Sequence, residues 1–445
     1  MDQKRSQTKS IPQNEKLNPT VYIIFISLLL DLLAFTMILP LLPSLLEHYR
    51  LNDTTGLYKW LLSQIQYFQE LVGAPEQYSS VLFGGFLGSM FSFLQFIASP
   101  ILGGISDVIG RKIVMVFCLV GIASSYVLWA LSNNLTIFIF ARFIGGLSKA
   151  NVSLSMAIIS DVSSVKTRSV GMALVGIAFS LGFIIGPLIG AIFAVWAKSK
   201  TGEWFVVPAI FAFCLSFFDL IFFIYFFKET LPQEKRAKSV WKSLHNAKAL
   251  IDLRDLFQFR AITDAKSSDI TQLRKLGTVY FIYLFIYSGL EFTLTFLTHH
   301  TFKYNSMQQG WMFFGIGIIM AVIQGSYVRK IPPHKIKSTA IIGLWLIVPS
   351  FVCVGLASWS WTLYLGLILF AVSTALVVPC MMTMASLYGT AHQKGTVMGI
   401  FRSLGALARA LGPIFASIAF WGLGSTVTYL TGAIGLLWPV LLLQK

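Results

Sequence analysis

The chain has 445 residues, of which 56% are hydrophobic and only 12% are charged, and it carries a formal net charge of +16. This composition excludes an ordinary soluble globular protein, in which about 25% of residues are charged. The positive charge would suggest nucleic acid in a soluble chain, but here the basic residues follow the membrane segments, so we expect no nucleic-acid partner. We predict an all-α membrane protein.

Apolar runs that can cross a hydrocarbon core of about 30 Å, which takes about 20 residues each, recur along the chain in two sets. The first set covers 21–46, 79–102, 113–131, 135–160, 169–196 and 204–227. The second set covers 276–298, 311–328, 338–357, 361–387, 395–421 and 425–443. We therefore predict twelve transmembrane helices in two six-helix halves, 21–227 and 276–445, with a tail at 1–20 and a linker at 228–275.

The positions of the basic residues predict the orientation. Of the 34 Lys and Arg, 25 lie in the tails and in the loops on the side of the termini, and five lie in the opposite loops. Basic loops stay in the cytoplasm, so both termini are expected there. The sequon at Asn52 then falls in the exoplasmic loop 47–77, where we predict glycosylation.

Two segments outside the spans show amphipathic helical spacing. In the exoplasmic loop, the stretch LYKWLLSQIQYFQELV at 57–72 repeats apolar residues at helical intervals, which predicts a helix on the outer membrane surface. It either covers the surface or acts as a gating lid. In the linker, Val240 to Phe259 combines Trp241 with several basic residues and predicts a basic interfacial helix.

The sequence contains two glycine-containing motifs, one in a turn and one in a helix. The turn GGISDVIGRK between helices 2 and 3 contains Gly103, Asp107, Gly110, Arg111 and Lys112. Helix 5 contains Gly182, Gly186, Pro187 and Gly190, whose one-turn spacing permits backbone contact with a facing helix. A shift of 226 residues places Gly186-Pro187 on Gly412-Pro413, and a shift of 257 places Phe35-Thr36 on Phe292-Thr293. These matches indicate a duplicated half.

The turn motif resembles the signature of the major facilitator superfamily, although Val108 replaces the usual base. The helix 5 motif, LDLLAFTMILPLLP in helix 1 and ARFIGG in helix 4 resemble the drug/proton antiporter branch, and in particular the tetracycline/proton antiporters and the animal tetracycline transporter-like proteins. The resemblance implies the major facilitator fold, alternating access, a cavity lined by helices 1, 4, 7 and 10, and efflux of organic anions and drugs. It also implies that Asp107 caps the start of helix 11 near Lys394.

Seven charged residues fall inside predicted spans, where each costs about 2.5 to 3.5 kcal/mol. They are Asp31, Arg142, Lys149, Asp219, Glu291, Arg402 and Arg409. We interpret Asp31 and Arg142 as a proton-coupling pair, with a purely structural ion pair as the alternative. Glu291 is either a second proton carrier, a substrate contact or a structural acid, and a structural role accounts best for Asp219.

The excess of bases over acids among these residues favours an anionic substrate. We predict substrate contacts for Lys149, Arg402 and Arg409, and for Gln95 and Gln324 at similar places in the two halves; neutralisation of acids or packing are the alternatives.

The expected function is secondary active transport, as proton-coupled antiport of an amphipathic organic anion or drug. The alternatives are a uniporter or symporter, or a non-transporting scaffold of the same fold. We expect no enzyme activity, cofactor or metal, because the sequence contains no phosphate loop, HExxH motif or nucleophile elbow. The expected partners are the organic anion, protons and the bilayer, and the protein is expected to be a monomer. The plasma membrane, an acidic organelle and the nuclear inner membrane all remain open.

Overall fold

The computed structural model describes most of the chain. The described residues are 17–52, 56–72, 79–198, 204–237, 239, 241, 243, 248, 250–260, 262, 266–388 and 394–445. Of the predicted helix 240–259, residues 241, 243, 248 and 250–259 are described, and its last part contains α11.

The described elements of the N-terminal half are all helical. They are α1 (Pro19–Thr36), η1 (Leu39–Leu41), α2 (Leu42–Asn52), α3 (Leu57–Val72), α4 (Ser79–Ile109), α5 (Arg111–Ala130), α6 (Leu135–Ser148), α7 (Asn151–Val162), α8 (Val165–Lys198) and α9 (Val206–Phe226). The linker contains η3 (Gln233–Lys235) and α11 (Leu253–Gln258). The C-terminal half contains α12 (Ser267–His300), α13 (Ser306–Ser326), η4 (Val328–Lys330), η5 (Pro333–Lys335), α14 (Ile336–Gly355), α15 (Ser360–Leu387) and α16 (Lys394–Gln444).

The predicted fold of twelve membrane crossings is confirmed. The described residues contain 11 helical spans that are long and apolar enough to cross a membrane. The last of these, in α16, is two crossings joined end to end, because Gly424 adopts φ 81° and ψ 168° in the middle of the run. A side chain would be strained at that φ, so glycine allows the chain to reverse there.

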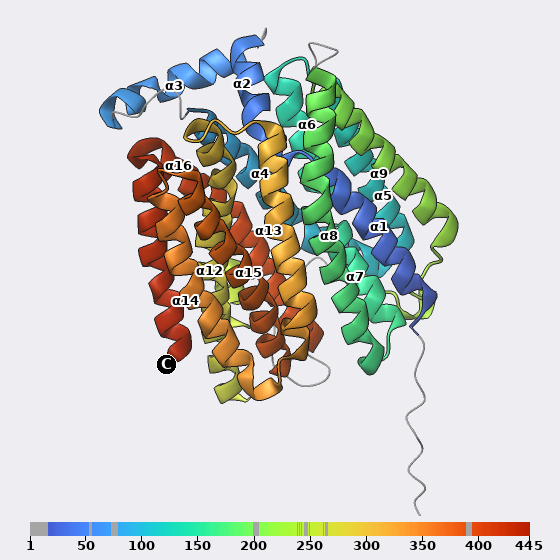
Figure 1. The fold of residues 1–445 in the computed structure, drawn as a ribbon. Helices are drawn as coiled ribbons and strands as arrows, with labels where there is room; N and C mark the ends of the chain where they lie inside the picture. Colours follow the sequence, from blue (N-terminus) through green and yellow to red (C-terminus); the bar gives the residue numbers. More distant parts are fainter. Residues whose placement is uncertain are drawn as a thin grey trace, which may run out of the picture.

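The two halves lie side by side, and α3 lies across one end of the bundle, opposite the end where the chain starts and finishes (Figure 1). We call these the α3 end and the terminal end. α3 occupies the stretch 57–72 for which the sequence predicts an amphipathic helix. Asn52 is exposed at the end of α2, beside α3, and its glycosylation stays a prediction.

Asparagine side chains start several crossings. Asn18 accepts a hydrogen bond from the Thr20 amide at the start of α1, and Asn134 accepts one from the Ile137 amide at the start of α6. Asn305 and Gln308 form a reciprocal capping box at the start of α13. Each cap satisfies amide groups that the first helical turn leaves without a partner.

Two crossings of the N-terminal half are interrupted. The first changes from α1 through η1 to α2 around Pro40 and Pro43. The fourth is interrupted between α6 and α7 at Lys149, whose backbone has φ −81° and ψ 35°. The buried Lys149 thus lies where the helix is broken.

In both halves the first and fifth crossings approach each other at glycines. A Cβ on Gly186 of α8 would meet Leu33 and Thr36 of α1, and a Cβ on Gly412 of α16 would meet Phe285 and Ser288 of α12. Thr36 donates a hydrogen bond of 2.7 Å to the Gly182 carbonyl across the first contact. The position of this contact in each half agrees with the duplication predicted from sequence.

The halves contact each other at the α3 end. There Gly85 of α4 faces Pro413 and Ser417 of α16, and Gly310 of α13 faces Pro187 and Ala191 of α8. Ser89 of α4 accepts a 2.9 Å hydrogen bond from the Ile414 amide. Toward the terminal end of the same four helices, a Cβ would meet nothing within 4 Å at Gly103, Gly176, Gly325 or Gly399. The two halves are therefore packed together at the α3 end, and these four glycines toward the terminal end have no close neighbour.

The linker is attached to both halves. Its first part follows α9, and the Ala237 amide donates a 2.9 Å hydrogen bond to the Asp107 carbonyl. Its second part packs on the C-terminal half, with Phe259 against Gly277 and Phe401, and with the Gln258 carbonyl accepting a 3.1 Å hydrogen bond from Arg274.

Candidate functional site

A buried ion pair joins the first and fourth crossings. Lys149 Nζ lies 2.7 Å from both carboxylate oxygens of Asp31, and the two residues are 3% and 1% exposed. Because the ammonium reaches both oxygens, the pair is fully formed without water. Breaking it by removing either partner would leave a buried charge without compensation.

The expected partner of Asp31, Arg142, lies elsewhere. Its guanidinium carbon sits 4.2 Å from the centre of the Phe91 ring, and Lys149 Nζ sits 4.6 Å from the centre of the Phe35 ring. The two rings are stacked, with centroids 5.3 Å apart. Two aromatic rings thus separate the two cations, and each cation is stabilised by the ring face it touches. The predicted pairing of Asp31 with Arg142 is wrong in this conformation.

Asp219 of α9 lies near this ion pair. It is 0% exposed, and within the described part of the chain neither of its carboxylate oxygens forms a complete hydrogen bond. Asp31, Lys149 and Ser27 are its electrostatic neighbours. The N-terminal half therefore contains two buried carboxyl groups close to one lysine.

The C-terminal half holds two arginines on the eleventh crossing. Arg402 and Arg409 are near enough to each other to repel, and Tyr280 of α12 lies close to both. Arg402 Nη1 is buried without a hydrogen-bond partner, whereas the Arg409 side chain is exposed near the middle of the crossing. In the described residues, neither arginine forms a salt bridge.

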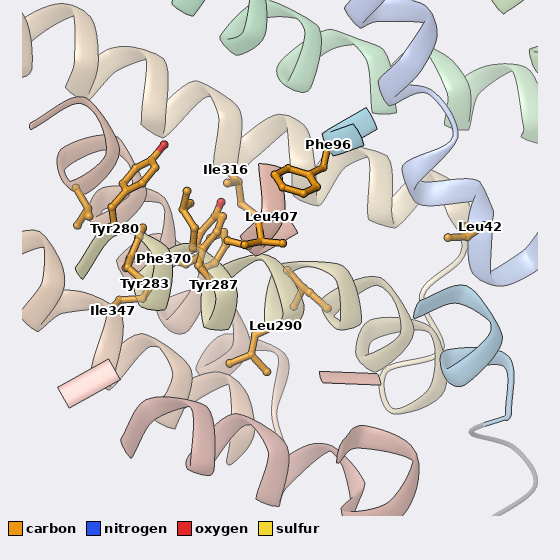
Figure 2. Close-up of a cluster of buried hydrophobic side chains, with 14 of the residues drawn as sticks. Leu42, Phe96, Tyr280, Tyr283, Tyr287, Leu290, Ile316, Ile347, Phe370 and Leu407 are labelled. Atoms are coloured by element: carbon orange, nitrogen blue, oxygen red, sulfur yellow. The ribbon is translucent and has the colours of Figure 1, made fainter. Parts of the chain in front are cut away.

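Glu291 of α12 lies in an aromatic region. Its carboxylate accepts a 2.8 Å hydrogen bond from Tyr287. Figure 2 shows Tyr287 beside Phe370, and the two rings stack with their centroids 5.0 Å apart and an angle of 8° between their planes. Tyr283 also stacks on Tyr287, with the ring centroids 5.5 Å apart. The phenol hydrogen bond orients Glu291 without neutralising it.

The two predicted glutamines differ in their contacts. Gln324 of α13 accepts a 3.3 Å hydrogen bond from Ser180 of α8, so it connects the two halves. Gln95 is half-buried in α4. Their role in substrate binding stays a prediction.

The turn between α4 and α5 forms an ion-pair cluster within its own half. Arg111 lies 2.7 Å from Asp107 and 3.0 Å from Asp161 at the end of α7. The Asp107 side chain is 48% exposed. The start of α16 at Lys394, which the resemblance implied as the partner of Asp107, is described without its side chain, and the capping of this helix by Asp107 stays a prediction.

Glu229, which follows α9, caps the start of α5. Its carboxylate accepts hydrogen bonds of 3.1 Å from the amides of both Arg111 and Lys112. Gly110, at φ 111°, leaves room for this carboxylate, because a Cβ there would meet Glu229 and Arg236. Burial opposes the ionised form of Glu229, but its backbone hydrogen bonds, including those from Leu231 and Thr230, outweigh burial and hold its pKa below the ordinary value of 4.5.

The sequence alone did not predict the role of four residues at these sites: Asp161, Glu229, Phe35 and Phe91. Asp161 ends the fourth crossing and was not distinguished from an ordinary boundary acid. Glu229 is 118 residues from Arg111, so no local pattern connects them. Phe35 and Phe91 are two of 38 phenylalanines, and nothing in their spacing indicates that they separate cations.

Two related six-helix halves that enclose buried charges, and that pack together at the α3 end, are the architecture of a membrane carrier. Residues 24–413 match the Major Facilitator Superfamily, and the chain belongs to this family. It is a membrane transporter and not an enzyme, as the sequence predicts.

The relatives agree with this assignment. The chain is 46% identical to the mouse major facilitator superfamily domain-containing protein 10, over 96% of this chain and 92% of the relative. It is similar to the crystal structure of the human organic anion transporter MFSD10 (TETRAN), with 45% identity, a TM-score of 0.79 and coverage of 95% and 98%. It is also 23% identical to the class B tetracycline resistance protein of Escherichia coli, over 91% and 89% of the two chains.

Proposed function

We propose that the protein exchanges protons for an amphipathic organic anion or drug across the membrane. One observation carries the proposal: the N-terminal half holds a closed Asp31–Lys149 ion pair, while Arg402 and Arg409 of the C-terminal half form no salt bridge among the described residues, and Glu291 is only an electrostatic neighbour of Arg409. The first arrangement takes up a proton and the second takes up an anion.

The proton-binding step follows from the ion pair. Protonation of Asp31 removes the negative charge that holds Lys149, so the ammonium no longer ties the first crossing to the fourth. The fourth crossing is already interrupted at Lys149, and its two parts, α6 and α7, need no further hydrogen-bond loss to change their relative angle. Protonation thus shifts the equilibrium between the two conformations of the carrier.

The anion-binding step follows from the arginines. An exposed arginine near the middle of a membrane crossing has to face a water-filled cavity, since exposure to lipid would be costly. Arg409 is such a residue, and Arg402 has an unused donor one heptad away on the same face. A carboxylate or sulfonate placed between them would accept charge-assisted hydrogen bonds. Tyr280 supplies an adjacent aromatic surface for the apolar part of the ligand.

The names of two relatives support the substrate class. The human MFSD10 structure is described as an organic anion transporter, and the Escherichia coli relative as a tetracycline resistance protein. With the predicted cytoplasmic termini, the terminal end is the cytoplasmic one, and the α3 end, where the halves pack together, is the exoplasmic one.

Transport into proteoliposomes tests the proposal. We expect the wild type to take up fluorescein or labelled tetracycline when the inside of the liposome is the more acidic side, because protons then leave in exchange for the substrate. The double variant Asp31→Asn with Lys149→Gln removes both charges and leaves no unpaired ion; it should lose the effect of the gradient while still exchanging substrate across the membrane. Glu234→Gln alters an exposed acid of the linker and serves as the matched control.

The other outcomes separate the alternatives. Substrate uptake by the wild type that is independent of the pH gradient would indicate a uniporter. Uptake that requires the outside of the liposome to be the more acidic side would indicate a symporter. Absence of transport for both probes, with binding also absent, would contradict the proposal.

A further inference from the structure

Asp219 is a buried acid that the proposed mechanism does not use. It lies in α9 with its side chain 0% exposed; within the described part of the chain its carboxylate oxygens form no complete hydrogen bond, and the Ser27 hydroxyl of α1 is the neighbouring polar group able to donate one. An ionised carboxylate in such a place would lack both solvation and compensation, which is among the most unfavourable arrangements in a protein interior. A carboxylic acid tolerates the same surroundings far better.

The charged groups around Asp219 give the same answer. From α1 it faces Asp31 and Ser27, and from the break between α6 and α7 it faces Lys149. α8 carries no ionisable residue from Val170 to Trp196. On α5 the ionisable residues inside the bundle are Cys118 and Tyr126, which are both neutral at physiological pH.

Among the described residues Lys149 is therefore the one cation that directly faces both acids, since the Phe35 and Phe91 rings lie between it and Arg142, and it is already bound to both oxygens of Asp31. If both acids were ionised, the group would hold a net negative charge away from water. We propose that Asp219 is a second proton-binding site: it holds a proton while Asp31 is paired with Lys149, and it releases that proton when Lys149 changes partner.

The proton balance of this exchange is closed. When Asp31 gains a proton, an O–H bond forms on its carboxylate and Lys149 is released as an ammonium ion. Lys149 then pairs with Asp219, whose O–H bond breaks as its proton leaves to water. The three residues hold one ionised acid, one neutral acid and one ammonium before and after, so no net charge is buried in either arrangement. A compact, rotatable ammonium on a flexible stem is suited to such an exchange.

This inference deepens the proposed function, because it assigns a second carrier of the proton to the same half. It also explains why the pairing of Lys149 with Asp31 is compatible with a second acid nearby. A purely structural Asp219 would keep its protonation state when its neighbours are changed, which gives a direct way to tell the two apart.

Infrared spectroscopy of the full-length protein in lipid nanodiscs at neutral pH tests the assignment. The carbonyl stretch of a protonated carboxyl group should disappear in Asp219→Asn. It should also disappear in Asp31→Asn, because Lys149 is then free to pair with Asp219 and ionise it. In Lys149→Gln a second such band should appear, since Asp31 loses its cation. Any band from Glu291 is common to all variants and cancels in the differences, and Glu234→Gln should leave the spectrum unchanged.

If the Asp219→Asn variant keeps every protonated-carboxyl band of the wild type, Asp219 is ionised and the proposal is overturned. An Asp219 band that persists in Asp31→Asn would also overturn it. The spectra do not depend on transport, so a failure of proton-driven uptake with the expected spectra would reject the proposed function and leave the protonation of Asp219 standing.

Discussion

The two halves of the transporter treat buried charge in opposite ways. In the N-terminal half, Lys149 is closed onto Asp31 at 2.7 Å, and two stacked rings keep Arg142 apart from that pair. In the C-terminal half, Arg402 and Arg409 share one helix face and form no salt bridge among the described residues, while Glu291, an electrostatic neighbour of Arg409, accepts a hydrogen bond from a phenol. In both halves a glycine of the fifth crossing nevertheless packs against the first crossing, although the residues it meets are not the ones that the 257-residue shift matches.

The difference shows how a duplicated scaffold divides its tasks. Where the Asp31 carboxylate stands in α1, the matching position in α12 under the 257-residue shift is Ser288, which donates a hydrogen bond to the Ala408 carbonyl. The charge of this position is not kept. Under the proposed function, the closed ion pair responds to protons and the arginines respond to anions. The following three predictions test this division, starting with the largest effect.

Breaking the closed pair should have the largest effect. Lys149→Ala leaves Asp31 buried without a cation, and we expect a loss of about 3 to 5 kcal/mol of stability, measured as thermal unfolding of the detergent-solubilised protein. Adding Asp31→Asn to Lys149→Ala should restore most of that loss, because the uncompensated charge is gone. A single variant as stable as the wild type would contradict the buried ion pair.

Removing the positive charge of Arg402 should weaken substrate binding and leave the fold intact. For Arg402→Gln we expect weaker binding of an anionic substrate by about 1.5 to 3 kcal/mol, or roughly 10- to 100-fold in Kd, with no loss of thermal stability. Arg402→Lys keeps the charge and should retain part of the affinity. Equal affinity in the wild type and Arg402→Gln would place the anion elsewhere.

The smallest expected effect is on stability, and it concerns how the third crossing of each half is capped at its start. Glu229 caps α5, whereas α14 begins after Lys335 without a side-chain cap. Since the folded-state pKa of Glu229 lies below 4.5, its stabilisation is complete above that value and declines as the pH falls through the lower folded-state pKa. We expect Glu229→Gln to lose about 1 kcal/mol near neutral pH.

The difference in melting temperature between Glu229→Gln and the wild type should therefore narrow in acid. The C-terminal half offers the matched comparison: Lys335→Gln should show no such pH dependence. A constant difference across the acid range would mean that Glu229 acts without its charge.

The sequence is sufficient for the twelve crossings because each is a local property of about 20 residues. It also identified the charged residues inside the bilayer, since any charge there is exceptional. It was insufficient for their pairing. Arg142 and Lys149 are seven residues apart and share a helix face, so spacing cannot decide which of them reaches Asp31. Packing decides it, through the rings of Phe35 and Phe91 and the backbone break at Lys149.

The same reasoning explains the missed cap. Gly110 was recognised as part of a turn motif, but the reason for glycine there is the carboxylate of Glu229, which arrives from the far end of the N-terminal half. Contacts of this range depend on the assembled bundle and leave no periodic trace in the chain.

The attachment of the linker has a consequence for the covalent continuity of the chain. The part up to Ala237 is bound to the turn before α5, and the part around Phe259 is bound to α12 and α16. Each half thus keeps its own portion of the connection when the peptide between Ala237 and Leu250 is cut. We therefore expect two separately encoded polypeptides to assemble in the membrane, with the interface between the halves, and not the backbone, holding them in register.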